Sequence, residues 1–419
     1  MSSGAADSAR AGWPTGDQRG GLARRVVVVA EFVDPTRNST GYYWHKTIKG
    51  LAAAGTEVVV VSTAASIKLA QPVDVPVRWC PIPREVRYNN DVVPLRILGQ
   101  FRLALSLART AKSQLRANDV LFCGTNPPFL LVMLGLLRRW GQFRLVMLVH
   151  DVFPENAVAA GLVRIHAPHY KLVKWIYDRT YERADALIAI GRDMVETLHQ
   201  KTRGRAAISY VPNWVDAAEI STRPTAGQEP LAKAAPGQVL FQYFGNLGRV
   251  QGLDLLLAAI KQVRHPRARF VFIGSGAMTE QVKAFAAADP HGRVQVLPAL
   301  NLQRNNEGLL ACDVAMITLA PGMKGLAVPS KAYFSMAADK PILVVGDIDT
   351  ELELLLREHS AVGWHCKAGD PRALARIIES ICDDDLQLRA GLPRRLVEQA
   401  FDRDQAIRAY LPILLNDPL

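Results

Sequence analysis

The sequence predicts two α/β domains, each a doubly wound parallel sheet, that face one another across a cleft. Apolar runs with little alternation, typical of strands covered on both faces, recur along the chain and are separated by helical segments. The pattern breaks once near the middle and then restarts. At 419 residues the chain also exceeds the length at which one hydrophobic core stops growing, so two domains are expected.

The first domain opens with a βαβ unit, in which "RVVVVAEF" (25–32) and "TEVVVVST" (56–63) flank the helical "YYWHKTIKGLAAAG" (42–55). Right-handed crossovers through the later helices give a parallel sheet. The other strands predicted in this domain are 119–125, 143–149, 185–191 and 207–212.

After a break rich in Ala, Pro, Thr and Gly the alternation restarts, and the pattern of 401–415 predicts a terminal helix. The strands predicted in the second domain are 239–245, 268–274, 293–298, 314–319 and 340–346. The predicted units are a disordered leader (1–23), a first domain (24–216), a linker (217–236), a second domain (237–400) and a C-terminal helix (401–419).

Composition narrows the class of protein. Five scattered Cys without a CxxC pair argue against a disulfide framework and against a zinc site, and they fit a reducing cytosol. The polar start lacks the apolar segment of a signal peptide, and "PPFLLVMLGLL" is about half of the ~20 residues of a spanning helix. The net charge of +11 indicates an anionic partner, while no nucleic-acid-binding module is recognisable.

The strand "LVMLVHDVFP" (145–154) ends in His150 and Asp151. Ligands of open α/β sheets bind beyond the carboxyl ends of the strands, so both residues are candidates for chemistry. The alternative is that His150 caps a turn.

Glycine turns follow two strands of the second domain: "YFGNLGRVQGLD" holds Gly245 and Gly248, and "FIGSGAM" holds Gly274. Glycine lets the backbone approach a phosphate closely, although such turns are also ordinary connections. Neither matches a dinucleotide fingerprint or a Walker P-loop, which disfavours a dehydrogenase and a P-loop NTPase.

In "GLAVPSKAYFSMAADKPIL", Pro329 marks a helix start and places Ser330 and Lys331 in the first turn. A lysine is electrostatically unfavourable there unless an anion is bound. The segment therefore predicts a phosphate site.

The segment 95–116 predicts an amphipathic helix with a basic face opposite its apolar face. It either packs on its own sheet with the basic face in water, or lies near an anionic membrane. The apolar face carries Ile97, Phe101, Ala104, Ala108, Ala111 and Leu115, and the basic face carries Arg102, Arg109 and Arg116.

Taken in order, these motifs resemble the group 1 glycosyltransferases, which are retaining and metal-independent and have the GT-B fold, and in particular the branch that builds bacterial exopolysaccharide, capsule or O-antigen. The resemblance runs from about Arg25 onward. It rests on "STGYYWHKTIKGLAAAG", "VHDVFP", "ADALIAIG", "VPNWVD", "FGNLGRVQGLD", "FIGSG" and "VPSKAYFSMAADKPIL".

The resemblance implies an acceptor-binding first domain, a second domain that binds a nucleotide sugar, and a C-terminal helix that crosses back to the first domain. Gly41, in the loop after the first strand, would lie near the donor phosphates and the reacting sugar. His150 would contact the donor sugar or help to stabilise the transition state. Asn213 would lie at the start of the chain segment that connects the two domains. Gly245 and Gly248 would approach the diphosphate. The remaining implied donor-site residues are Gly274, Ser330 and Lys331.

The sequence departs from the wider family at the donor site. Asn246 and Gln251 stand where many members have Arg and Lys, and Leu326 and Phe334 stand where the family has paired glutamates. Positive charge at the diphosphate is then expected from Arg249 and Lys331, with Asn246 beside them.

The implied function is hexosyltransferase-like transfer from a nucleotide-diphosphate sugar, without a cofactor or metal, to a polyprenyl-diphosphate-linked glycan. The expected location is the cytoplasmic face of the cell membrane, bound peripherally to its anionic surface. One alternative is a non-catalytic GT-B subunit that partners an active transferase, because the glutamates and the basic pair are missing. Another is a different GT-B enzyme such as a sugar-nucleotide epimerase.

Overall fold

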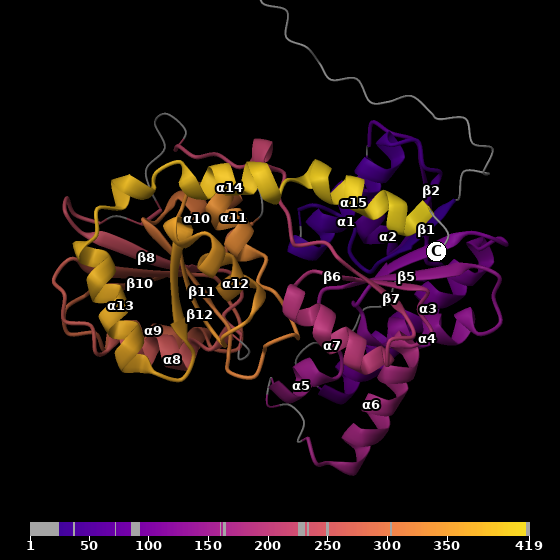
Figure 1. The fold of residues 1–419 in the computed structure, drawn as a ribbon, viewed down its shortest axis with the longest axis horizontal. Coiled ribbons are helices and arrows are strands. Elements are labelled where there is room, and N and C mark those ends of the chain that lie inside the picture. Colours follow the sequence, from indigo (N-terminus) through magenta and orange to yellow (C-terminus); the bar gives the residue numbers. More distant parts are fainter. Residues whose placement is uncertain are drawn as a thin grey trace, which may run out of the picture.

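The computed structural model of the chain describes residues 25–36, 38–71, 73–84, 93–159, 161, 165–224, 231–232, 234–248, 251–301 and 304–415. Figure 1 shows two α/β domains side by side, with the C-terminal helices running across both of them. The predicted two-domain fold is confirmed. The expected leader lies outside the described residues.

The first domain is built on a seven-stranded parallel sheet in the order β3-β2-β1-β4-β5-β6-β7. Its central strands are fully buried, as expected where helices cover both faces. The strands are β1 (Val26–Val29), β2 (Val58–Ser62), β3 (Val77–Pro81), β4 (Val120–Gly124), β5 (Arg144–Val149), β6 (Ala186–Ala189) and β7 (Ala207–Tyr210).

Helices cover the two faces of this sheet, and Figure 1 shows one layer above it and one below. The upper layer consists of α1 (Ser39–Ala53), α2 (Ala64–Ala70) and α15 (Arg403–Leu415). In the lower layer each helix contacts the next, and its members are α3 (Val93–Gln114), α4 (Pro128–Arg138), α6 (Pro168–Tyr181) and α7 (Arg192–Thr202). The short α5 (Glu155–Ala159) precedes α6.

The second domain has a six-stranded parallel sheet in the order β10-β9-β8-β11-β12-β13. Its strands are β8 (Val239–Phe244), β9 (Ala268–Ile273), β10 (Val294–Leu297), β11 (Val314–Thr318), β12 (Ile342–Gly346) and β13 (Gly363–Lys367). Its helices are α8 (Leu253–Ile260), α9 (Thr279–Ala287), α10 (Asn305–Leu310), α11 (Lys331–Ala337), α12 (Glu351–Glu358), α13 (Pro371–Asp383) and α14 (Leu392–Ala400).

Two strands were not predicted, and both are edge strands. β3 reads "VRWCP" and β13 reads "GWHCK", so each mixes polar residues with Trp and Cys instead of presenting an apolar run. An edge strand is covered less completely than a central one, so its sequence carries a weaker signal.

The C-terminal helix crosses back onto the first domain, as expected. Val215 pairs with Asp402 in an isolated bridge, and the indole Nε1 of Trp214 donates to the hydroxyl of Tyr410, 3.2 Å away. α15 packs against α1.

The amphipathic helix predicted over 95–116 is α3. Its middle packs on the sheet as predicted, with Ala104, Ala108 and Ala111 buried, but Ile97 and Phe101 near its start are exposed. Within the part of the chain that the structure describes, no helix combines the length and apolarity required to span a bilayer.

Candidate active site

A large cleft lies between the two domains. Its volume is about 1090 Å³, which is in the range of sites for sizeable ligands. Both domains contribute walls, including the ends of β5 and β8 and the start of α11. The cleft therefore lies beyond the carboxyl ends of strands from both sheets, where α/β proteins bind ligands.

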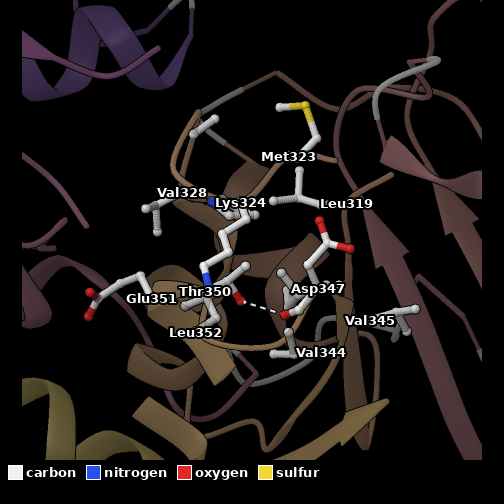
Figure 2. Close-up of a pocket in the computed structure, with 14 residues that line it drawn as sticks. Leu319, Met323, Lys324, Val328, Val344, Val345, Asp347, Thr350, Glu351 and Leu352 are labelled. Carbon is white, nitrogen blue, oxygen red and sulfur yellow. Dashed lines mark hydrogen bonds between the residues drawn. The ribbon is translucent and has the colours of Figure 1, made fainter. Parts of the chain in front are cut away.

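A second cavity lies beneath the loop 319–330, which connects β11 to α11 (Figure 2). Its volume of about 20 Å³ has room for a water molecule but not for a sugar. The hydroxyl of Thr350 donates to the carbonyl oxygen of Asp347 over 3.1 Å and ties the end of β12 to the start of α12. Because this cavity is too small for a sugar, the large cleft is the candidate site.

Two glycine turns form one wall of the cleft. A side chain on Gly274 would place its Cβ 1.8 Å from the carbonyl oxygen of Gly245, so the turns after β8 and β9 pack backbone against backbone. The amide of Leu247 donates to the carbonyl of Ser275 over 2.9 Å. Only glycine permits this approach, and it leaves the backbone of both turns facing the cleft.

Lys331 begins α11 with Ser330 at the N-cap. Its buried Nζ has no hydrogen-bond partner and lies 3.8 Å from the centre of the Tyr243 ring. Burial lowers the pKa of Lys331 to about 7. The hydroxyl of Tyr243 donates to the carbonyl of Asn246 over 2.8 Å, so one aromatic ring supports both the lysine and the first glycine turn.

Three described lysines line the cleft, and they differ in their partners. Lys46 forms ion pairs with Asp216 and Glu219, and Lys49 pairs with Asp74 over 2.8 Å. Lys331 has no carboxylate partner. Among these three, Lys331 is therefore the one whose amine is not already paired with a carboxylate and can bind an anionic ligand.

His150 and Asp151 lie directly after β5 and line the cleft, as predicted. The amide of Asp151 donates to the Thr125 hydroxyl over 3.3 Å, and Asp151 also forms an antiparallel bridge with Ala327 of the second domain. The His150 and Tyr43 rings are 6.2 Å apart. The end of β5 is thus held between its own sheet and the opposite domain.

Burial shifts the pKa values of these two side chains in opposite directions. It lowers the pKa of His150 to about 4 and raises the pKa of Asp151 to about 6. At pH 7 the imidazole is neutral and can donate or accept a hydrogen bond, while about nine in ten Asp151 carboxyls are ionised. The pair can present a neutral hydrogen-bonding group beside an anion.

Two family descriptions match the chain: "Glycosyltransferase Family 4" over residues 40–219 and "Glycosyl transferases group 1" over residues 231–403. The probable glycosyltransferase WbjE of Pseudomonas aeruginosa is 39% identical over 381 residues, which cover 90% of this chain and 94% of WbjE. The chain belongs to the group 1 glycosyltransferases.

Solved structures agree with the fold of this glycosyltransferase. Anabaena HepE, crystallised in complex with UDP, matches with a TM-score of 0.65 at 17% identity, covering 93% of this chain and 99% of HepE. WaaG, a glycosyltransferase involved in lipopolysaccharide biosynthesis, matches with a TM-score of 0.65 at 13% identity, covering 93% of this chain and all of WaaG. At these identities the match shows the GT-B fold.

Most of the predicted site residues of this glycosyltransferase line the same cleft. Those that do are His150, Asp151, Asn213, Gly245, Asn246, Gly274, Ser330 and Lys331. Gly248 is buried near the first turn and is not part of the cleft wall. Arg249 lies outside the described residues. Among the described residues, no three His, Cys, Asp or Glu side chains form a group that could hold a metal ion.

Gly41 was expected in the loop after the first strand, but it lies in the first turn of α1 and is buried. A Cβ there would lie 2.1 Å from the carbonyl oxygen of Asp34. Its amide donates to the side chain of Asn38 over 2.8 Å, which caps the helix. The position thus allows α1 to start close to the end of β1.

Sequence reasoning missed how the two domains meet. The carbonyl of Leu326 accepts from the amide of Val152 over 2.9 Å, and the side chain of Asn213 donates to the carbonyl of Val328 over 3.2 Å. Glu351, which is 1% exposed, accepts from the side chains of Arg192 and Tyr210. No local pattern marks these contacts, although Asn213 already stood out in its motif.

Proposed function

We propose that this chain transfers a sugar, with retention of configuration and without a metal, from a nucleotide-diphosphate sugar to a polyprenyl-diphosphate-linked glycan of a bacterial surface polysaccharide. The observation that carries the proposal is the buried, unpaired Nζ of Lys331 beside two glycine turns in the interdomain cleft. UDP, bound by the structural neighbour HepE, is an anion of the kind that this site suits.

In the proposed reaction, Lys331 and the backbone of the glycine turns bind the diphosphate. Negative charge develops there as the bond between sugar and phosphate breaks, and fixed donors stabilise it. The neutral His150 donates a hydrogen bond to the donor sugar, and the carboxylate of Asp151 stabilises the positive character of the sugar. The acceptor hydroxyl attacks the sugar on the face from which the nucleoside diphosphate leaves, which retains the configuration, and the hydroxyl proton passes to an oxygen of the departing diphosphate.

The polysaccharide pathway in this proposal is supported by a relative. WcaI of Escherichia coli (strain K12), 19% identical, is described as a putative colanic acid biosynthesis glycosyl transferase. We propose that the enzyme works at the cytoplasmic face of the cell membrane and binds peripherally to anionic lipid.

The test begins with a thermal-shift panel of uridine and guanosine diphosphate sugars. The stabilising donor is then incubated with lipid-linked acceptor, with and without EDTA, and the anomeric configuration of the product is read by NMR. Retention of configuration at an undiminished rate in EDTA supports the proposal. An inverted product contradicts the retaining mechanism, and a rate lost in EDTA contradicts metal independence.

The non-catalytic alternative rests on Leu326 and Phe334, which take the places of the family's glutamates. In the structure both serve packing: Leu326 is buried, and the Phe334 ring lies 5.4 Å from that of Tyr42 across the cleft. Donor binding without any turnover on lipid-linked acceptors would favour this alternative. Conversion of the donor without acceptor would indicate an epimerase instead.

A further inference from the structure

Exposed large apolar side chains gather on two helix ends of the first domain. Fourteen such side chains are exposed among the described residues. Eight of them lie either near the start of α3 or within residues 165–175, which lead into α6 and form its first half. We call these eight the overhang patch. Its members are Leu95, Ile97, Leu98, Phe101, Ile165, Leu172, Val173 and Trp175.

Both helix ends extend past the carboxyl edge of the sheet. The ring of Phe101 lies 5.9 Å from that of Phe129, the second residue of α4, and α4 begins just after β4 ends. The ring of Tyr177 lies 6.1 Å from that of Phe153, just after the end of β5. Because crossover helices run antiparallel to the strands, the residues that precede Phe101 and Tyr177 lie beyond this edge.

The cleft opens at the same edge, since His150 and Asp151 follow β5 there. Figure 1 shows α6 projecting from the bottom of the first domain, away from the sheet. The overhang patch is therefore carried by projecting helix ends on the side of the domain where the active site opens.

The charge around the patch is positive. Residues 95–102 of α3 contain two Arg and no Asp or Glu. Residues 165–177 contain two Lys and no Asp or Glu, and one of these, Lys174, pairs with Glu155 and Asp178. Arg102 and Lys171 are exposed on the same helix ends as the apolar residues. Exposed apolar side chains gathered on neighbouring helix ends indicate a binding surface, and nearby basic residues favour an anionic one.

We propose that the overhang patch inserts into the headgroup region of an anionic lipid bilayer and places the cleft at the membrane surface. This inference rests on the proposed function in one respect: a lipid-linked acceptor would be presented at a membrane. Trp175 and Leu172, 57% and 59% exposed on α6, supply the deepest apolar contacts, and the basic residues attract the lipid headgroups.

The chain provides a matched control. Leu136 lies in the last turn of α4, and Trp140, which is 75% exposed, lies just after the helix ends, so both are at the end of α4 away from the cleft. Replacing them removes the same residue types from the same domain but not from the overhang patch. Comparing the two pairs of variants therefore distinguishes an effect of the overhang patch from the effect of removing exposed apolar side chains in general.

The experiment measures binding of the full chain to vesicles of phosphatidylcholine alone or with about 30% phosphatidylglycerol, by flotation and without donor or acceptor. We expect the parent to bind the anionic vesicles, Leu172→Ser with Trp175→Ser to weaken that binding at least tenfold, and Leu136→Ser with Trp140→Ser to leave it nearly unchanged. Melting temperatures check that every variant is folded.

A second measurement does not depend on the serine variants. Vesicles of brominated lipid quench tryptophan that enters the bilayer, so Trp175→Phe should remove most of the quenching, whereas Trp140→Phe should leave it. Equal effects of the two variant pairs, or a parent that does not bind anionic vesicles, would overturn the proposal. So would light scattering that shows the Leu172/Trp175 variant dissociating a dimer, because the patch would then join two copies of this chain.

These results are independent of catalysis, because no substrate is present. If the protein binds vesicles but transfers no sugar, the proposed function fails and the docking surface stands. If transfer to a short, water-soluble acceptor proceeds while neither variant pair alters vesicle binding, the docking surface fails and the function stands.

Discussion

Binding of a nucleotide-diphosphate sugar should take up a proton at Lys331. Burial lowers the pKa of this lysine to about 7 in the free protein, and its Nζ has no hydrogen-bond partner. A diphosphate in contact with Nζ favours the charged form and returns the pKa toward its ordinary value of about 10.4. The uptake follows because the bound state holds the proton more tightly than the free state.

The magnitude follows from these two pKa values. At pH 8 about one free molecule in ten carries the proton, so binding should take up about 0.9 proton, whereas at pH 6 it should take up about 0.1. Affinity should fall as pH rises, by about 90-fold between pH 6 and pH 9. The diphosphate of a nucleotide sugar has no ionisation in this range that would add to the signal.

Isothermal titration calorimetry in buffers of different ionisation enthalpy measures the uptake directly. Lys331→Met should abolish it and weaken binding at pH 6 by about 10- to 150-fold, equivalent to the ~1.5–3 kcal/mol of a charged hydrogen bond. Lys49→Met is the control, because Lys49 lines the same cleft but pairs with Asp74. Uptake by Lys331→Met equal to that of the parent would refute this assignment.

Four other changes test the remaining site and surface. His150→Ala should lower turnover at least tenfold without loss of the folded state, as judged by its melting curve; an unchanged rate would make His150 a turn residue. Turnover should fall as the pH drops through about 6, the raised pKa of Asp151, because the carboxylate is then protonated. Asp151→Asn should have a much lower rate that no longer changes with pH in this range. Gly274→Ala should destabilise the protein by about 1–3 kcal/mol in urea unfolding, because its Cβ would meet backbone; normal stability would contradict the packing. Changing the three exposed arginines of the predicted basic face to Gln should flatten the salt dependence of vesicle binding but not change folding; a parent-like salt dependence would exclude them. These arginines are Arg102 and Arg109 on α3 and Arg116 just after its end.

The sequence was sufficient to predict the architecture and the location of the cleft. Apolar runs of a parallel sheet are unambiguous when both faces are covered, and their ends fall on one edge of the sheet. His150 and the two glycine turns were predicted together for this reason. The edge strands β3 and β13 were missed because partial exposure admits polar residues that hide the pattern.

The contacts between the domains could not be predicted in the same way. The hydrogen bond from Asn213 to Val328 joins residues 115 positions apart, and that from Arg192 to Glu351 joins residues 159 apart. Periodicity reports which face of a helix or strand is covered, but not which distant element covers it. The carboxylate partners of Lys46 and Lys49 could not be predicted either. The sequence therefore could not show that Lys331 alone among these three lysines is unpaired.

The interdomain contacts give a physical account of Leu326 and Phe334, the two positions where the resemblance to the family leads us to expect glutamates. The carbonyl of Leu326 pairs with Val152 of the first domain, and its buried side chain joins the core, so this position acts through its backbone and through packing. Phe334 packs on Tyr42 and Tyr43 of the first domain, with ring centres 5.4 and 6.2 Å apart. A carboxylate at position 326 would be buried against apolar neighbours, at a cost that a nearby cation would have to offset, whereas position 334 is half-buried and lines the cleft. Apolar residues there pack between the domains, and among the three described lysines that line the cleft Lys331 alone has no carboxylate partner, so in the proposed function it is the one expected to bind the donor diphosphate.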